Sequence, residues 1–169
     1  MKEGDKAMAD RTFAGLSYDA VLQKYADTVA GVCVMRLQNW ADAEDCFQNT
    51  FIKLFQKSPD FQSKSHLKAW LIRVAINECR NYLAKNRRFL SLDRLEREPI
   101  GWHDNERDVS WAMMRLEPKY REVLYLHYCE RYKVDEIAQI LKKNPNTVKT
   151  LLKRGREKLR LIYGGDEDE

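Results

Sequence analysis

The sequence predicts an all-α protein built from two small helical domains that are joined by a flexible linker. Apolar residues recur three or four positions apart along most of the 169 residues, and no stretch sustains the alternation typical of a strand. Glycine, at seven residues, is scarce. Hydrophobic residues make up 44% of the chain and charged residues 33%, a balance that suits a folded protein rather than a disordered one.

Two helices are expected in the N-terminal third. The first runs over about Ser17–Leu37, with Ser17 as its N-cap. After a break, the second begins at Asp42, whose carboxylate can cap free amides, and stops at Ser58-Pro59. Its inward residues are Phe47, Phe51, Leu54 and Phe55. Its other face starts acidic and rich in amides, at Asp42, Glu44, Asp45, Gln48 and Asn49.

A third helix is expected over about Ser65–Lys85. Its outer side carries basic and amide side chains spaced three or four residues apart, which therefore share a surface. With the lysines near its start, this set is Lys64, Lys68, Arg73, Asn77, Arg80 and Asn81.

The periodicity fades after Asn86, where charge, proline and glycine mix with isolated apolar residues. We therefore predict five parts along the chain. They are an N-terminal tail (1–15), a first domain (16–88), a linker (89–107), a second domain (108–163) and an acidic tail (164–169).

The second domain is expected to open with a helix that has Pro118 in its first turn. The inward residues of this helix should be Val123, Leu124 and Tyr128. Two more helices follow around a tight turn. Asn144-Pro145 begins the last one, since the residue before a proline suits an N-cap and proline fits the first helical position.

That last helix separates into two faces when residues are placed about 100° apart. Its apolar side carries Val148, Leu151, Leu152, Gly155 and Leu159. The polar and basic candidates for DNA contact are Asn146, Thr147, Lys149, Thr150, Lys153, Arg154 and Arg156. This pattern is typical of a helix-turn-helix, whose second helix enters the major groove. An amphipathic surface helix, or a helix pair that binds protein, is the alternative.

Basic residues gather in two separate segments. Residues 64–88 hold seven Lys or Arg against one acid, and residues 142–160 hold eight against one. Two such segments indicate two contacts with a polyanion, because Lys and Arg that displace counterions from phosphates supply most non-specific affinity for nucleic acid. A pair of solvated helix faces would give the same composition.

Other classes of function find little support in the sequence. No apolar run approaches the roughly 20 residues that cross a bilayer, so a cytoplasmic protein is expected. The four cysteines have no CxxC spacing and are expected to be buried thiols, with metal or redox chemistry as the alternative. The three histidines show no metal-ligand spacing, and there is no nucleophile elbow or phosphate loop. We expect no enzyme, no metal, no cofactor and no small-molecule substrate.

Three segments together resemble the extracytoplasmic-function (ECF) group of bacterial sigma-70-type RNA polymerase sigma factors. ADAEDCFQNTFIKLF is similar to region 2.2 of that family, and HLKAWLIRVAINECRNYL is similar to regions 2.3 and 2.4. LEPKYREVLYLHYCERYKVDEIAQILKKNPNTVKTLLKRGREKLR is similar to region 4. The resemblance implies a subunit that binds core RNA polymerase, recognises and opens the minus-10 promoter element, and binds the minus-35 element. The alternative is a free-standing helix-turn-helix regulator that uses only the second domain.

The resemblance also implies roles for the candidate residues. The acidic and amide-rich set from Asp42 to Asn49 would bind the clamp helices of the largest polymerase subunit, and the second domain would bind the flap of the second-largest one. Asn77 and Asn81 would contact minus-10 bases, while Lys64, Lys68, Arg73 and Arg80 would neutralise the opened strand. The basic face of the last helix would read the minus-35 element. A cognate anti-sigma factor is a further implied partner.

Overall fold

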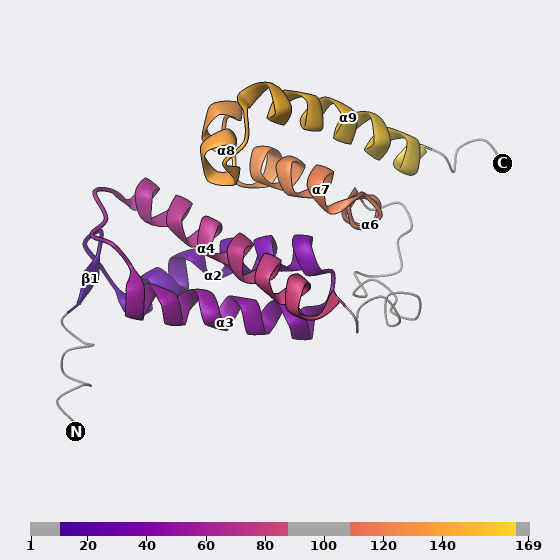
Figure 1. Ribbon diagram of the computed structural model, residues 1–169. Coiled ribbons are helices and arrows are strands. Elements are labelled where there is room, and N and C mark those ends of the chain that lie inside the picture. Colours follow the sequence, from indigo (N-terminus) through magenta and orange to yellow (C-terminus); the bar gives the residue numbers. More distant parts are fainter. Residues whose placement is uncertain (1–10, 88–108, 165–169) are drawn as a thin grey trace.

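The computed structural model describes residues 11–87 and 109–164, which form two helical units packed against each other (Figure 1). The predicted all-α fold class is confirmed. The predicted linker and most of the two predicted tails lie outside the described residues, although Gly164 of the predicted acidic tail belongs to the last helix. In chain order the elements are β1 (Thr12–Phe13), β2 (Leu16–Ser17), α2 (Tyr18–Leu37), α3 (Trp40–Lys57), α4 (Lys64–Lys85), α6 (Val109–Met114), α7 (Pro118–Leu124), the π-helix η1 (Tyr125–Cys129), α8 (Val134–Leu141) and α9 (Pro145–Gly164).

The first unit is a bundle in which α2, α3 and α4 all contact one another. Ser17 caps α2 as predicted, since its hydroxyl accepts a hydrogen bond from the backbone of Ala20 at 3.2 Å. The predicted cap of the next helix is wrong. Asn39 has extended backbone angles, and its Oδ1 accepts from the backbone N–H of Asp42 at 3.2 Å, so Asn39 is the N-cap and Asp42 lies in the first turn.

A short antiparallel hairpin with two residues in each strand precedes the bundle; it begins in the segment predicted as a tail and ends at Ser17. Thr12 pairs with Ser17, and Phe13 is 2% exposed in the core. The guanidinium of Arg11 donates to the backbone carbonyl of Phe55 and, at 3.0 Å, to the hydroxyl of Ser58. Arg11, directly before the hairpin, thus donates hydrogen bonds at the carboxyl end of α3, where the last helical carbonyls have no partners within the helix.

The second unit departs from a regular helix after α7. Pro118 occupies the first turn as predicted, but Tyr128 is 51% exposed rather than buried, so that prediction is wrong. The reason is the π-helix η1, in which the N–H of Glu130 bonds to the carbonyl five residues back, in Tyr125, at 3.1 Å. This wider turn rotates the following side chains, and Leu126 is buried in their place.

Helices α8 and α9 form the predicted helix-turn-helix. Asn144 caps the start of α9, because its Oδ1 accepts a hydrogen bond from the backbone N–H of Asn146 at 2.8 Å. Val148 and Leu152 are buried beneath the helix. Gly155 allows α9 to approach α7 closely, since a Cβ at this position would lie 3.2 Å from Leu124. The sequence-predicted inward face is therefore confirmed.

The second unit lies across α2 and α4 of the first (Figure 1). Helix α7 contacts α2, and α8 contacts α4. Arg36 pairs with Glu122, and the side-chain amide of Gln38 donates to the carbonyl of Met114. Ile76, which is 3% exposed, borders the same small cavity as Leu126. The contact between the units thus combines apolar side chains with ion pairs and a hydrogen bond.

Candidate protein and nucleic-acid interfaces

The exposed face of α3 carries most of the predicted polymerase-binding set. Glu44, Asp45, Gln48 and Asn49 are all exposed. Asp42 is half-buried instead, and its Oδ1 accepts a hydrogen bond from the hydroxyl of Tyr82 at 2.6 Å. Asp42 therefore ties α3 to α4, and the open part of the surface consists of the other four side chains.

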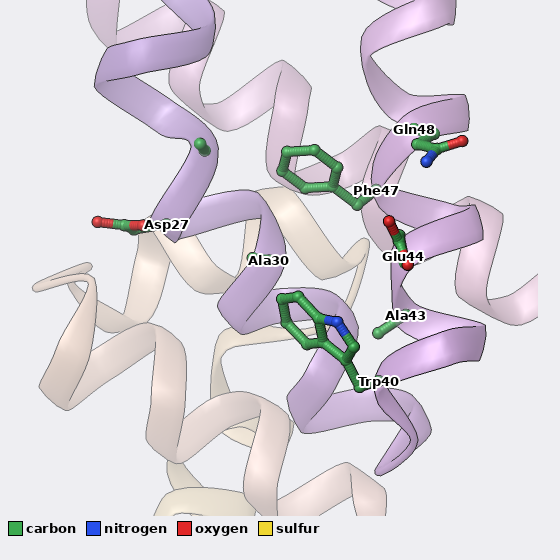
Figure 2. A pocket seen from close by; sticks show the side chains of 8 residues that line it. Asp27, Ala30, Trp40, Ala43, Glu44, Phe47 and Gln48 are labelled. Carbon is green, nitrogen blue, oxygen red and sulfur yellow. The ribbon is translucent and has the colours of Figure 1, made fainter.

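A shallow hollow of about 260 Å³ lies beside that face, between α2 and α3. Figure 2 shows the rings of Trp40 and Phe47 reaching from α3 toward α2, with Glu44 and Gln48 on the turns alongside. Trp40 is 56% exposed. An exposed tryptophan beside an apolar hollow and a carboxylate makes a typical protein-binding surface, because it combines large contact area with a charged rim.

Sequence reasoning found the charged half of this surface and missed the apolar half. With the second helix predicted to begin at Asp42, Trp40 falls in the break before it, whereas in the structure Trp40 is the first residue of α3. The available signal was Asn39, which is an excellent N-cap and would have placed Trp40 on the helix.

The basic and amide set on α4 is divided between open and covered positions. Lys64, Asn77, Arg80 and Asn81 are exposed. Lys68 and Arg73 are half-buried, and Lys68 Nζ lies 2.8 Å from the carboxylate of Glu130 in the second unit. Asn77, Arg80 and Asn81 follow one another at helical spacing, so they form a single open patch on α4.

Every predicted minus-35 residue lies on the outside of α9. Exposed side chains there include Asn146, Thr147, Lys149, Thr150, Lys153, Arg154 and Arg156. The hydroxyl of Thr150 donates to the carbonyl of Asn146 at 3.0 Å, and Arg156 donates to the hydroxyl of Tyr128 at 3.3 Å. The seven side chains differ in reach and polarity, but all are available to a duplex that approaches the second unit from solvent.

Three of the four cysteines meet in the first unit. Cys33, Cys46 and Cys79 come from α2, α3 and α4 and are buried, as predicted, whereas Cys129 is exposed and the prediction is wrong there. The wide η1 turn that exposes Tyr128 also carries Cys129 outward. A hydrogen bond with Cys79 and then burial raise the pKa of Cys46, and a hydrogen bond with Cys33 raises the pKa of Cys79. Such thiols stay protonated and unreactive.

Among residues 11–87 and 109–164, no group of three or more His, Cys, Asp or Glu side chains is arranged to hold a metal ion. Within the same ranges, no helix has the length and apolar character that a membrane span requires.

Two family models match the chain, one on each unit. Sigma-70 region 2 matches residues 21–89, and Sigma-70 region 4 matches residues 108–159. The free-standing regulator is not favoured, since a regulator of that kind would need only the second match.

Two known ECF sigma factors are similar to the chain over most of its length. The ECF RNA polymerase sigma factor SigW of Bacillus subtilis is 27% identical over 180 residues, covering 95% of this chain and 91% of SigW. The ECF RNA polymerase sigma-E factor of Haemophilus influenzae is 27% identical over 174 residues, covering 90% of this chain and 92% of its own.

Solved structures share the fold. The sigma factor RpoE of Bartonella quintana, in complex with the anti-sigma factor NepR, superposes with a TM-score of 0.71 at 22% identity, over 89% of this chain and 98% of RpoE. CnrH, in complex with the cytosolic domain of CnrY, superposes with a TM-score of 0.64 at 21% identity, over 89% of this chain and 90% of CnrH. With region 2 and region 4 in order on one chain and ECF sigma factors similar along its length, the protein belongs to the ECF family of sigma-70 RNA polymerase sigma factors and acts in promoter-specific transcription initiation.

Proposed function

We propose that three separate surfaces bind the polymerase, the minus-10 element and the minus-35 element. The exposed face of α3 is proposed to bind core RNA polymerase. The exposed residues Glu44, Asp45, Gln48 and Asn49 offer an acidic, amide-rich rim. Trp40 and Phe47 provide apolar contact area in the adjoining hollow. A basic partner helix would meet charge complementarity at the rim and a desolvated aromatic anchor at the centre. The clamp helices of the largest polymerase subunit are the partner that fits the family.

The patch on α4 is proposed to act on the minus-10 element. Asn77 and Asn81 each offer a donor and an acceptor, which suits recognition of the hydrogen-bonding edge of an unstacked base. Arg80 lies between them on the same exposed side and would neutralise the backbone of the opened strand. Lys64 is exposed at the start of the helix and would make a separate contact with the backbone of the strand.

Helix α9 is proposed to read the minus-35 duplex. Its first turns would place Asn146, Lys149 and Thr150 at the base edges, as in other helix-turn-helix proteins. Arg154 and Arg156 lie further along the exposed side and are better placed for phosphates. The single observation that carries this assignment is that the buried residues of α9 are all on one side, which leaves the basic side open.

The remaining partners and the setting follow from membership of the family. The second unit would also contact the flap of the second-largest polymerase subunit, and a cognate anti-sigma factor would cover the polymerase-binding surfaces. A protein with these partners works in the cytoplasm. It carries no catalytic step itself, because the polymerase performs the chemistry.

Run-off transcription tests the proposal directly. Core bacterial polymerase would be offered a library of promoter sequences, with and without the full-length protein. Specific transcripts that require the protein are expected, and aligned start sites would reveal both elements. Absence of any protein-dependent transcript, with duplex binding retained, would overturn the proposal.

Two substitutions on α3 identify the polymerase-binding face. Gln48→Ala should weaken binding to core polymerase, since Gln48 lines the hollow beside Trp40. Gln56→Ala is the matched control, because it removes the same kind of exposed side chain two turns further along the helix. Equal affinities of the two variants for polymerase would refute the placement of the surface.

A further inference from the structure

The wide turn of η1 places an aromatic side chain beside the DNA-binding helix. Regular helical periodicity would turn Tyr128 toward the core, but the π-helical turn leaves it 51% exposed. Its hydroxyl accepts a hydrogen bond from Nη1 of Arg156 on α9 at 3.3 Å. Single π-helical turns are rare and often mark functional sites. Tyr128 is therefore a candidate functional residue of the second unit.

Neighbouring contacts hold the Tyr128 ring in place at the surface. The ring of His127 packs edge-on against it, with centroids 4.9 Å apart and planes at 82°. His127 is itself fixed, because its Nδ1 lies 2.8 Å from the backbone carbonyl oxygen of Tyr132. A carbonyl oxygen only accepts, so Nδ1 is the donor in this bond. A side chain that is ordered in advance loses little conformational entropy when a ligand binds.

The hydroxyl of Tyr128 keeps a free donor. A phenol can accept and donate at once, and here its oxygen accepts from Arg156. Within residues 11–87 and 109–164, no group accepts the hydroxyl proton. In the same ranges, Arg156 forms no ion pair with a carboxylate. A positive charge and a neutral donor therefore lie side by side at the surface, which is an arrangement that suits a phosphate.

This pair lies where α9 would leave the major groove. Arg156 follows Lys149 by two turns, so the two side chains share one side of the helix about 10 Å apart along its axis. Lys149 is proposed to reach base edges, and the groove is about 12 Å wide. On the same side, Lys153 and Arg160 are also exposed and basic. The anion at this position would be a phosphate of the strand that borders the groove.

Resting on the proposed role of α9 at the minus-35 element, we propose that Tyr128 and Arg156 together bind one backbone phosphate beside that element. Arg156 supplies the positive charge and a charge-assisted hydrogen bond. Tyr128 donates a second hydrogen bond through its hydroxyl and holds the guanidinium in place. The contact carries no sequence information, so it strengthens binding to every duplex and fixes the register of α9 in the groove.

Two exposed tyrosines separate this contact from a general effect. Tyr128→Phe removes the hydroxyl and keeps the ring. Tyr163→Phe is the matched control near the far end of α9, where the side chain is 49% exposed. Binding of the polymerase holoenzyme to minus-35 duplexes should weaken roughly tenfold in Tyr128→Phe, because a hydrogen bond to a charged group is lost. The loss should be equal for matched and scrambled sequences, and Tyr163→Phe should bind as the wild type does. Wild-type affinity of Tyr128→Phe would overturn the proposal.

Salt dependence distinguishes a direct contact of Tyr128 from an indirect one. Tyr128→Phe changes no charge, so its slope of log K against log salt should equal that of the wild type, whereas Arg156→Ala should lower the slope. A slope in Tyr128→Phe as low as in Arg156→Ala would mean that Tyr128 only positions the arginine, which would overturn the direct contact. In the double variant, Tyr128→Phe should cost less than it costs alone, because the two donors share one phosphate. Additive losses would contradict a shared phosphate.

Methylphosphonate substitution locates the phosphate. Duplexes carry the uncharged methylphosphonate at one phosphate at a time, along both strands around the minus-35 element. One position should weaken binding of the wild type more than binding of Tyr128→Phe, and the lack of such a position would overturn the proposal. If the protein supports no specific transcript in run-off transcription, the proposed function fails. Binding of the full chain alone to duplex DNA at low salt, compared between Tyr128→Phe and Tyr163→Phe, then still decides whether Tyr128 contacts phosphate.

Discussion

Two substitutions on α9 should have different kinds of effect on promoter binding. Lys149 is exposed near the start of the helix, where side chains reach base edges, so Lys149→Ala should remove sequence discrimination. Arg156 lies further along and is oriented by the hydroxyl of Tyr128 at 3.3 Å, so Arg156→Ala should remove a phosphate contact.

The expected magnitudes follow from the two modes of contact. A base contact is worth about 1–3 kcal/mol of discrimination against the wrong base pair, so Lys149→Ala should reduce the preference for the best minus-35 sequence by roughly 5- to 150-fold. A phosphate contact contributes about 0.9 to the slope of log K against log salt. Arg156→Ala should lower that slope by about this amount and weaken all sequences alike.

The measurement is binding of the polymerase holoenzyme to matched and scrambled minus-35 duplexes, titrated across several salt concentrations. Lys119→Ala is the control, because it removes one positive charge from α7 in the same unit rather than from α9. An Arg156→Ala variant that loses discrimination with an unchanged salt slope would refute the assignment of roles along the helix.

Three further predictions concern α4, the core and the thiols. Asn77→Ala should reduce permanganate reactivity of minus-10 thymines while the minus-35 footprint is retained, and equal loss of both would contradict the division of labour. Leu54→Ala should lower the free energy of unfolding by about 2–5 kcal/mol, because Leu54 is 0% exposed between helices, whereas Ile52→Ala, at a position 48% exposed, should change it by less than about 1 kcal/mol in a denaturant titration. Ellman's reagent at neutral pH should modify Cys129 in the folded protein and the three buried thiols only after unfolding; a second fast thiol would count against the packing of the cysteine cluster.

Local features of the fold could be predicted from the sequence because they depend on neighbouring residues. Ser17 and Asn144 cap their helices through bonds that span two or three positions, and Pro118 fits the first turn of α7 for the same kind of reason. The open side of α9 was predictable too, since helical periodicity alone separates Val148 from the basic residues.

The errors arose where the backbone left the assumed helical period or where two caps competed. A count of 3.6 residues per turn predicts that Tyr128 faces inward, and η1 interrupts this count. Asp42 was a plausible cap, but Asn39 lies earlier and already satisfies the Asp42 amide. For the cap, the local sequence held a signal, because Asn39 is itself an excellent N-cap. For η1 it held none, because tertiary packing selects the wider turn.

The contact between the two units was beyond sequence reasoning. From the sequence alone, Lys68 is one more basic residue on a helical face that is expected to be exposed. Glu130 is one acidic residue in a turn. Their pairing depends on how the second unit is placed on α4, which helical periodicity does not specify. The same packing buries Ile76, which borders a small cavity with Leu126 of the second unit.

The hairpin ahead of α2 bears on how the first domain should be isolated for experiments. The match to Sigma-70 region 2 starts at residue 21, yet Phe13 fills the core and Arg11 bonds to the end of α3. An expression fragment cut at the family boundary would lose a core aromatic and leave carbonyls of α3 without their guanidinium. Fragments and chimaeras should therefore begin upstream of Arg11, because the folding unit extends further toward the N-terminus than the family match.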